Sequence, residues 1–198
     1  MSRRPNEKAR EHITQIAFNL FYENGFKGVS MDDVARGAGI KKANLFHYYP
    51  TKEDLGLAAL SYGTSCQKAG VEKRFSNGSD PIKVVEGMFT DAALSMKKNK
   101  CCRGCFMGNL AQEISDHNEK LRSKISDYFR FWVDRLTAFL EHWRVQGYFK
   151  KDLNPEESAE AIISLFEGAM LCSKATKETT ALENARKMAK AYLGGLKA

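Results

Sequence analysis

The sequence has little proline, no alternating β-branched segments and no long hydrophobic run. Only 4 prolines occur in 198 residues, and apolar residues recur at helical spacing, so we expect an all-α protein. No stretch approaches the roughly 20 consecutive apolar residues of a membrane-spanning helix. The opening segment MSRRPNEKAR also lacks the apolar region of a signal peptide. We therefore expect a cytoplasmic protein with no membrane partner.

Acidic residues are the minority among the charged side chains. There are 31 Lys+Arg against 24 Asp+Glu, a net charge of +7, which is compatible with a polyanionic partner but too small to establish one. The hydrophobic fraction of 43% is sufficient for a core and excludes general disorder. The 5 cysteines are an odd number, which favours free thiols over a disulfide scaffold.

Caps and helical periodicity predict nine helices. Capping boxes are expected where Ser30 precedes Asp33, Thr51 precedes Asp54 and Thr180 precedes Glu183, and Asn77-Gly78 predicts a break. The expected helices cover about residues 6–24, 31–36, 41–48, a long segment from 51, 81–98, 106–115, 119–147, a segment from 155, and 180–195.

The second and third of these helices have the spacing of a helix-turn-helix. They are separated by Gly37-Ala38-Gly39, a flexible turn of the length that this motif needs. On spacing alone, an ordinary helical corner fits about equally well. Residues 41–49, however, contain two lysines, Asn44, His47 and two tyrosines but no acid. This composition favours contacts with phosphates and base edges over a solvated helix face.

Residues 9–60 resemble the DNA-binding domain of the TetR family of bacterial transcriptional regulators. The resemblance rests on NGF at the end of the first helix and on the segments VSMDDVARGAGI, KKANLFHYYP and TKEDL. It implies a three-helix DNA-binding domain at residues 1–55 and a larger helical regulatory and dimerisation domain at residues 56–198. The chain departs from the family pattern at Lys41, where Ser or Thr usually caps the helix, and at Phe46, where Tyr is usual.

The same resemblance implies roles for individual residues. Lys42, Asn44 and His47 are expected to reach the major groove, where Asn pairs well with adenine and Lys with guanine. A solvent-exposed histidine without a role remains the alternative for His47. The residues expected to contact phosphates are Ser30, Lys41, Tyr48 and Lys52.

The resemblance also places a small-molecule pocket among the fourth to seventh helices. Aromatic and Met-rich linings with a few polar groups are typical of ligand pockets, although such a stripe is more often plain core. The candidate lining residues are Tyr62, Cys66, Phe89, Met96, Phe106, Leu110, Glu113, Phe129, Trp132 and Phe166.

Dimerisation is implied through the last two helices, where small residues allow close approach and larger ones anchor the contact. A dimer would also match the two half-sites of a near-palindromic operator. The candidate interface residues are Leu165, Gly168, Ala169, Cys172, Met188 and Tyr192.

Three cysteines lie within residues 101–105. Because a second spaced Cys/His pair is missing, we expect no metal. Cys105 precedes a helix and has basic neighbours in sequence, so we expect a lowered pKa for its thiol and a sensing role. The segment GCFMGNLAQEISD also resembles a TetR branch that includes electrophile and oxidant sensors. The alternative for Cys105 is a small buried hydrophobic residue.

These patterns together predict a dimeric regulator that binds double-stranded operator DNA. We expect a repressor released by a small-molecule effector, with covalent modification of Cys105 as the alternative signal. A Cys-dependent enzyme using Cys105 and His117 is weaker, because no third group orients the pair. A helical interaction protein that does not bind DNA is the remaining class. No catalytic residue and no cofactor are expected.

Overall fold

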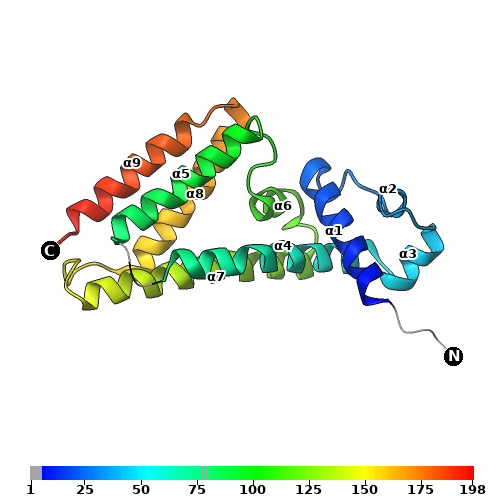
Figure 1. Ribbon diagram of the computed structural model, residues 1–198, viewed down its shortest axis with the longest axis horizontal. Helices are drawn as coiled ribbons and strands as arrows, with labels where there is room; N and C mark the ends of the chain where they lie inside the picture. The colour runs from blue at the N-terminus through cyan, green and yellow to red at the C-terminus, as the bar shows by residue number, and fades with distance from the viewer. Residues whose placement is uncertain (1–5, 77, 79) are drawn as a thin grey trace. The chain divides into compact units, whose positions relative to one another are not determined.

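The computed structural model describes residues 6–76, 78 and 80–198. Across these ranges the chain forms helices, apart from one isolated β-bridge between Phe149 and Lys197, so the predicted all-α fold is confirmed (Figure 1). The helices are α1 (Glu7–Asn24), α2 (Met31–Gly37), α3 (Lys42–Tyr48), α4 (Lys52–Arg74), α5 (Pro81–Lys98), α6 (Phe106–Ile114), α7 (Glu119–Val145), α8 (Pro155–Thr176) and α9 (Thr180–Gly195).

Local sequence determines where most of these helices begin. At α2, the Ser30 N–H donates to the Asp33 carboxylate at 2.9 Å and the Asp33 N–H donates to the Ser30 hydroxyl at 3.1 Å. Thr51 and Asp54 make the same reciprocal pair at α4. Both predicted capping boxes are therefore confirmed, because each needs only residues three apart in the chain.

The capping box predicted for the last helix at Thr180 and Glu183 does not form. α9 begins at Thr180, so its N-cap is Thr179, and no side chain accepts a hydrogen bond from the first turn. The Thr179 hydroxyl instead donates to the Glu183 carboxylate at 3.0 Å. Residue 77 of the predicted Asn77-Gly78 break and residues 1–5 of the predicted DNA-binding segment lie outside the described residues.

The chain packs into two compact units. The first unit consists of residues 1–67 and 109–128, and the second consists of residues 68–108 and 129–198. The long helices α4 and α7 each contribute to both units. The first unit contains the described part of the expected segment, residues 6–55, together with the first part of α4, most of α6 and the start of α7.

The core of the first unit fixes α3 against α1. Leu45 of α3 is fully buried, and Tyr49, which follows α3, is nearly so. The hydroxyls of Tyr49 and Thr14 of α1 lie 2.5 Å apart in a hydrogen bond. The Arg10 guanidinium lies over the Tyr49 ring. Because apolar and polar contacts both hold Tyr49, the short α3 has a fixed position on α1.

The core of the second unit lies among α5, α7, α8 and α9. α9 packs against both α5 and α8, and α5 and α9 run side by side (Figure 1). Aromatic rings fill the interior: Phe89 meets Phe166 edge-on at 5.4 Å between centroids, and Trp132 stacks on Phe166 at 6.4 Å. At one end, the Tyr148 hydroxyl donates to the Asp80 carboxylate at 2.9 Å.

Candidate DNA-binding interface and regulatory site

The turn between α2 and α3 depends on a glycine. Gly39 has a φ of +67°, and nothing lies within 4 Å of the position that a Cβ would take. Glycine is therefore favoured here by the backbone conformation and not by a lack of space, because residues with a Cβ rarely adopt positive φ. The N–H of Ile40 then donates to the carbonyl of Ala35 at 3.0 Å, which closes the turn and sets the start of α3.

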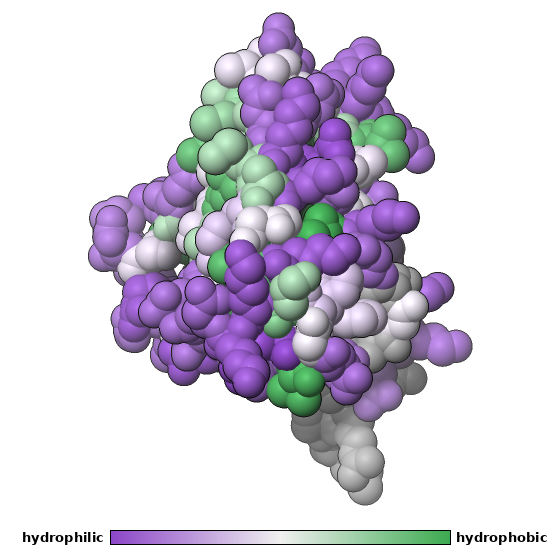
Figure 2. All heavy atoms as spheres, turned by 90° about the vertical axis from the view of Figure 1, so that its left-hand side faces the viewer, coloured by the Kyte–Doolittle hydropathy of each residue, from purple (hydrophilic) through white to green (hydrophobic). Residues whose placement is uncertain are grey.

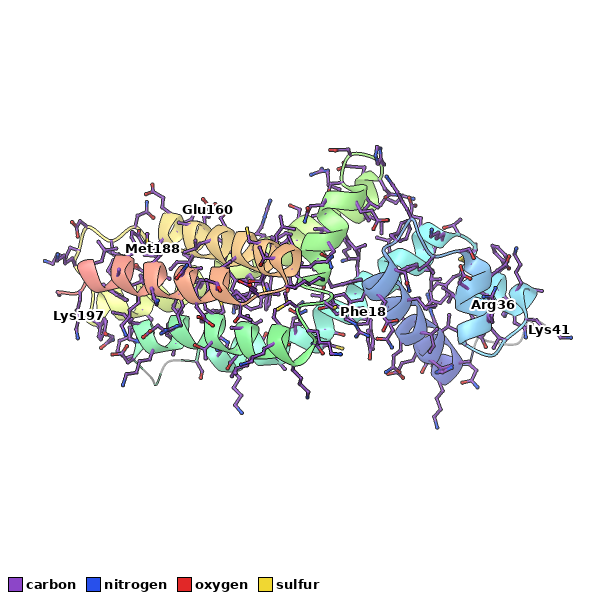
Figure 3. All side chains as sticks on the ribbon, turned by 90° about the horizontal axis from the view of Figure 1, so that it is seen from above. Phe18, Arg36, Lys41, Glu160, Met188 and Lys197 are labelled. Carbon is purple, nitrogen blue, oxygen red and sulfur yellow. The ribbon has the colours of Figure 1, made fainter. Side chains whose placement is uncertain are left out.

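α3 turns a polar and basic face to solvent. Lys42, Asn44 and His47 are exposed, while Leu45 between them is buried. Lys41 is the N-cap, and its side chain makes no capping bond, as expected for a cation at the positive end of a helix. Its side chain extends away from the helices (Figure 3). This face of α3 therefore carries donors for a polyanion and no carboxylate.

Two of the expected DNA contacts have partners in the free protein. The Lys42 ammonium lies 2.9 Å from the Asp32 carboxylate, with both side chains about half exposed. The Lys52 ammonium lies over the Phe26 ring at 4.6 Å, and partial burial lowers its pKa. An exposed ion pair contributes little, so Lys42 can exchange Asp32 for a phosphate or a base, whereas Lys52 is more firmly held.

The remaining expected contacts are Ser30 and Tyr48. The Ser30 hydroxyl serves the α2 cap and donates to Asp33 at 2.6 Å. Tyr48 is half-buried, with its ring edge-on to His47 at 5.6 Å. All seven expected residues belong to the first unit, and their DNA contacts remain predictions. The Arg10–Tyr49–Thr14 anchor was missed, because the motif gives no sign of which α1 residues Tyr49 meets.

The Glu113 side chain makes different contacts from those expected of a pocket-lining residue. Its carboxylate accepts the N–H of Phe26 at 2.8 Å and that of Lys27 at 2.5 Å, and Glu113 Oε2 would lie 3.0 Å from a Cβ on Gly25. The prediction that Glu113 is a polar lining residue is thus corrected: it joins α6 to the loop between α1 and α2. This contact could not be predicted from the sequence, because 86 residues separate Phe26 from Glu113.

The other residues of the expected pocket are divided between the units. Tyr62, Cys66 and Leu110 belong to the first unit. Tyr62 meets Phe18 edge-on at 5.4 Å, and Cys66 is exposed. The second unit holds Phe89, Met96 and Phe106, all buried, and Phe129, Trp132 and Phe166, all half-buried. Contact of any of them with an effector remains a prediction.

The expected lowering of the Cys105 pKa is wrong. Burial raises the pKa of the Cys105 thiol, and the neighbouring Glu167 carboxylate on α8 raises it further. The Gly108 N–H donates to Sγ at 3.4 Å and only partly opposes this effect. Burial also raises the pKa of Glu167. Cys105 is therefore a neutral thiol near pH 7, because its environment disfavours the thiolate.

The loop before Cys105 has an unusual backbone. Lys100, Cys101 and Arg103 have φ values of 52°, 51° and 70°, in the left-handed region that non-glycine residues rarely adopt. The Lys177 ammonium, 3.4 Å from the Cys101 carbonyl, ties this loop to the end of α8. All 5 cysteines of the chain are free. Among the described residues, no three Cys, His, Asp or Glu side chains form a group able to hold a metal.

Most of the expected dimer residues face solvent. Leu165, Gly168 and Cys172 of α8 are exposed, as are Met188 and Tyr192 of α9, and Met188 projects from its helix in Figure 3. From the C-terminal end, the visible surface is mainly hydrophilic with small hydrophobic groups (Figure 2). Leu165, Met188 and Tyr192 are thus large apolar side chains that keep 37%, 64% and 46% of their surface exposed in the single chain.

Ala169 is the exception among the expected dimer residues. Only 7% of its surface is exposed, and it belongs to the core of the second unit. The prediction that it lies at an interface is corrected, because helical spacing alone did not determine which side of α8 faces the core.

Comparison with known protein families identifies the family of this chain. The model of bacterial regulatory proteins of the tetR family matches residues 13–59, and the model of the tetracyclin repressor-like C-terminal domain matches residues 81–189. The chain belongs to the TetR family. It is thus a transcriptional regulator with a helix-turn-helix DNA-binding domain, and the resemblance recognised in residues 9–60 is confirmed.

Individual relatives are similar over nearly the whole TetR-family chain. The HTH-type transcriptional repressor NemR of Escherichia coli (strain K12) is 25% identical over 193 residues, 93% of this chain and 94% of that protein. The transcriptional regulator AcuR of Cereibacter sphaeroides is 28% identical over 168 residues, 84% of this chain and 76% of that protein. The crystal structure of the reduced form of E. coli NemR shares the fold, with a TM-score of 0.85 and 23% identity over 96% of this chain and 97% of that one.

Within the described residues, no helix is both long and apolar enough to cross a membrane.

Proposed function

We propose that this TetR-family regulator is a cytoplasmic, dimeric repressor that leaves its operator when a small molecule binds the C-terminal helices. The main support for the proposal is the exposed face of α3, which contains no acidic residue. On the opposite side, buried Leu45 and Tyr49 fix α3 in the core of the first unit. A rigid helix with outward donors suits insertion into the major groove. The name of the relative NemR, a transcriptional repressor, supports repression.

The proposed contacts divide into two kinds. Asn44 and His47 read bases, and Lys42 joins them after leaving Asp32. Lys41 and Tyr48 contact phosphates, with Ser30 and Lys52 at the edge of the site. Phosphate contacts set the affinity and base contacts the specificity, so the two kinds respond differently to salt and to DNA sequence.

The salt dependence of binding to DNA from upstream of the protein's own gene tests the phosphate contacts. The logarithm of the affinity should fall linearly with the logarithm of the salt concentration, with a slope of about −0.9 per neutralised phosphate. Lys41→Ala should make that slope shallower by about one unit. Lys187→Ala, an exposed lysine on α9, is the control and should leave it unchanged. An equal slope for both variants would contradict the assignment of Lys41.

Signal transmission is proposed to run through α6. Because the Glu113 carboxylate holds the N–H groups of Phe26 and Lys27, a shift of α6 moves the loop that leads into α2. At the start of α4, Glu53 accepts hydrogen bonds from Asn118 at 2.7 Å and Lys120 at 2.6 Å. An effector acts only if it favours one of two arrangements of these helices, since equal affinity for both shifts nothing.

Modification of Cys105 is a second candidate signal. The relative whose solved structure is described as a reduced form favours it, and the neutral thiol disfavours it. A thiol electrophile, N-ethylmaleimide, should release the parent from DNA but leave Cys105→Ser bound. Cys66→Ser, which removes an exposed thiol, is the control and should behave as the parent. Release that persists in Cys105→Ser would eliminate this route and leave the reversible pocket.

A further inference from the structure

A groove lies between α5 and α9 on the second unit, apart from the aromatic interior. Its volume is about 430 Å³, within the range of small-molecule sites. α5 and α9 run side by side along it (Figure 1). Its lining residues are Phe89, Thr90, Ala93, Leu94, Lys97, Thr179, Leu182, Glu183 and Arg186.

The floor of the groove is apolar. Phe89 and Leu182 are buried beneath it, and Ala93 is half-buried. Leu94 is 62% exposed, so a large apolar side chain lies at the groove without cover from the second unit. An apolar body placed here would remove the Leu94 surface from water, which is favourable.

Among the residues that the structure describes, the charges around the groove leave Lys97 without a carboxylate partner. The Arg186 guanidinium donates to the Glu86 carboxylate at 2.7 Å, and the Lys190 ammonium also lies 3.2 Å from Glu86. Glu183 accepts a hydrogen bond from Thr179. Lys97 lines the groove and has no carboxylate partner among the residues that the structure describes. An occupant with a negative charge therefore matches the groove.

We propose that the groove binds an amphiphilic anion, with an apolar body over Leu94, Ala93 and Leu182 and a carboxylate at the Lys97 ammonium. The Arg186 guanidinium donates to Glu86, 11 residues before Lys97 on α5, so the headgroup contact belongs to Lys97 alone. The groove shares Phe89 with the effector pocket of the proposed function, but its other lining residues are different ones.

The groove also has a connection to the interior. Phe89 lines the groove and meets Phe166 edge-on, and Phe166 stacks on Trp132. An anion in the groove therefore touches the same ring that closes one side of the aromatic cluster.

Titration calorimetry of the full chain with octanoate and with 1-octanol tests the site, since the two probes share a chain and differ in charge. Lys97→Gln should weaken octanoate binding by about tenfold, the usual effect of losing a charge-assisted hydrogen bond, and leave 1-octanol unchanged. Lys98→Gln, the next residue and outside the groove, should leave both unchanged. Equal effects of Lys97→Gln and Lys98→Gln on octanoate would overturn the proposal.

Two further variants test the apolar floor. Ala93→Phe should fill the groove and abolish binding of both probes. Leu94→Ala, at an exposed position that the fold tolerates, should weaken both and keeps the test valid if Ala93→Phe unfolds. Undiminished octanoate binding in Leu94→Ala would overturn the proposal, as would a change of oligomeric state in Ala93→Phe, which would make the groove a contact between copies. DNA binding without probe, measured in parallel, reports separately on the proposed repressor function.

Discussion

On α3, neighbouring side chains differ in burial. Leu45 is buried in the first unit while Asn44 and His47 on either side of it are not. Leu45, together with Tyr49 after the helix, therefore fixes the rotation of α3, and this rotation determines which side chains can reach DNA. The exposure of Asn44 and His47 agrees with the roles that the motif predicted for them.

Replacement of Asn44 tests direct base reading. Asn44→Ala should cost about 1–3 kcal/mol on the operator, because a bidentate amide contact to adenine is lost, and should barely affect binding to random duplex DNA. Fluorescence anisotropy with both duplexes measures the two effects. Equal weakening on both would assign Asn44 to a phosphate instead.

The raised pKa of the Cys105 thiol predicts a pH effect on stability. Its pKa is raised in the folded protein, whereas in the unfolded chain the thiol ionises near pH 8.5. The folded state thus holds the proton more tightly, so the stabilisation is complete below pH 8.5 and is lost as pH rises above it, by about 1.4 kcal/mol per pH unit for this group. Urea unfolding at pH 8 and pH 10 should show a smaller loss in Cys105→Ser than in the parent. Cys102→Ser, an exposed cysteine, should lose as much as the parent, and a parent-like loss in Cys105→Ser would contradict the assigned environment.

At the scale of helices, contacts three or four residues apart were predictable and contacts between distant elements were not. The caps at Ser30 and Thr51 follow from neighbours in the chain. The links from Glu113 to the α1–α2 loop and from Glu167 to Cys105 join residues many positions apart. These contacts contradict the expectations that Glu113 lines the pocket and that the Cys105 thiol has a lowered pKa. Tertiary neighbours determine the hydrogen bonds of a carboxylate and the pKa of a thiol.

The α5–α6 loop offers a test of backbone strain. Lys100 is exposed and has a φ of 52°, where glycine is favoured over other residues by up to about 1–2 kcal/mol. Lys100→Gly should therefore raise the free energy of unfolding, by up to about 1 kcal/mol after the added chain entropy of glycine is subtracted. Lys98→Gly, two residues earlier and within α5, is the matched control and should lower it. Urea denaturation measures both, and destabilisation by Lys100→Gly would contradict a strained loop.

For the whole molecule, recognition of a near-palindromic operator requires two chains. The exposed apolar side chains of Leu165, Met188 and Tyr192 lie on α8 and α9, where the family resemblance predicted a dimer. The sequence could predict this face from the family but not its exact residues, since Ala169 turned out to face the core. Two recognition helices are needed because each reads only half of a near-palindromic site.

Introducing a charge on this face should separate the dimer. Leu165→Asp would bury a carboxylate without a partner in each half of the interface, at a cost of several kcal/mol. Sedimentation velocity should show monomers. Val145→Asp replaces another exposed apolar residue outside α8 and α9 and should leave the dimer intact. A Leu165→Asp variant that stays dimeric would place the interface elsewhere.

Footprinting of the full chain on DNA from upstream of its own gene tests whether a dimer reads an operator through α3. A dimer that reads two half-sites through α3 should protect two patches about 10–10.5 base pairs apart, or a multiple of that spacing. Asn44→Ala should remove both patches at a concentration that saturates the parent, and Leu165→Asp should remove them together with the dimer. Protection of a single patch by the parent, or protection that survives in Asn44→Ala, would contradict a dimeric repressor that recognises its operator through α3.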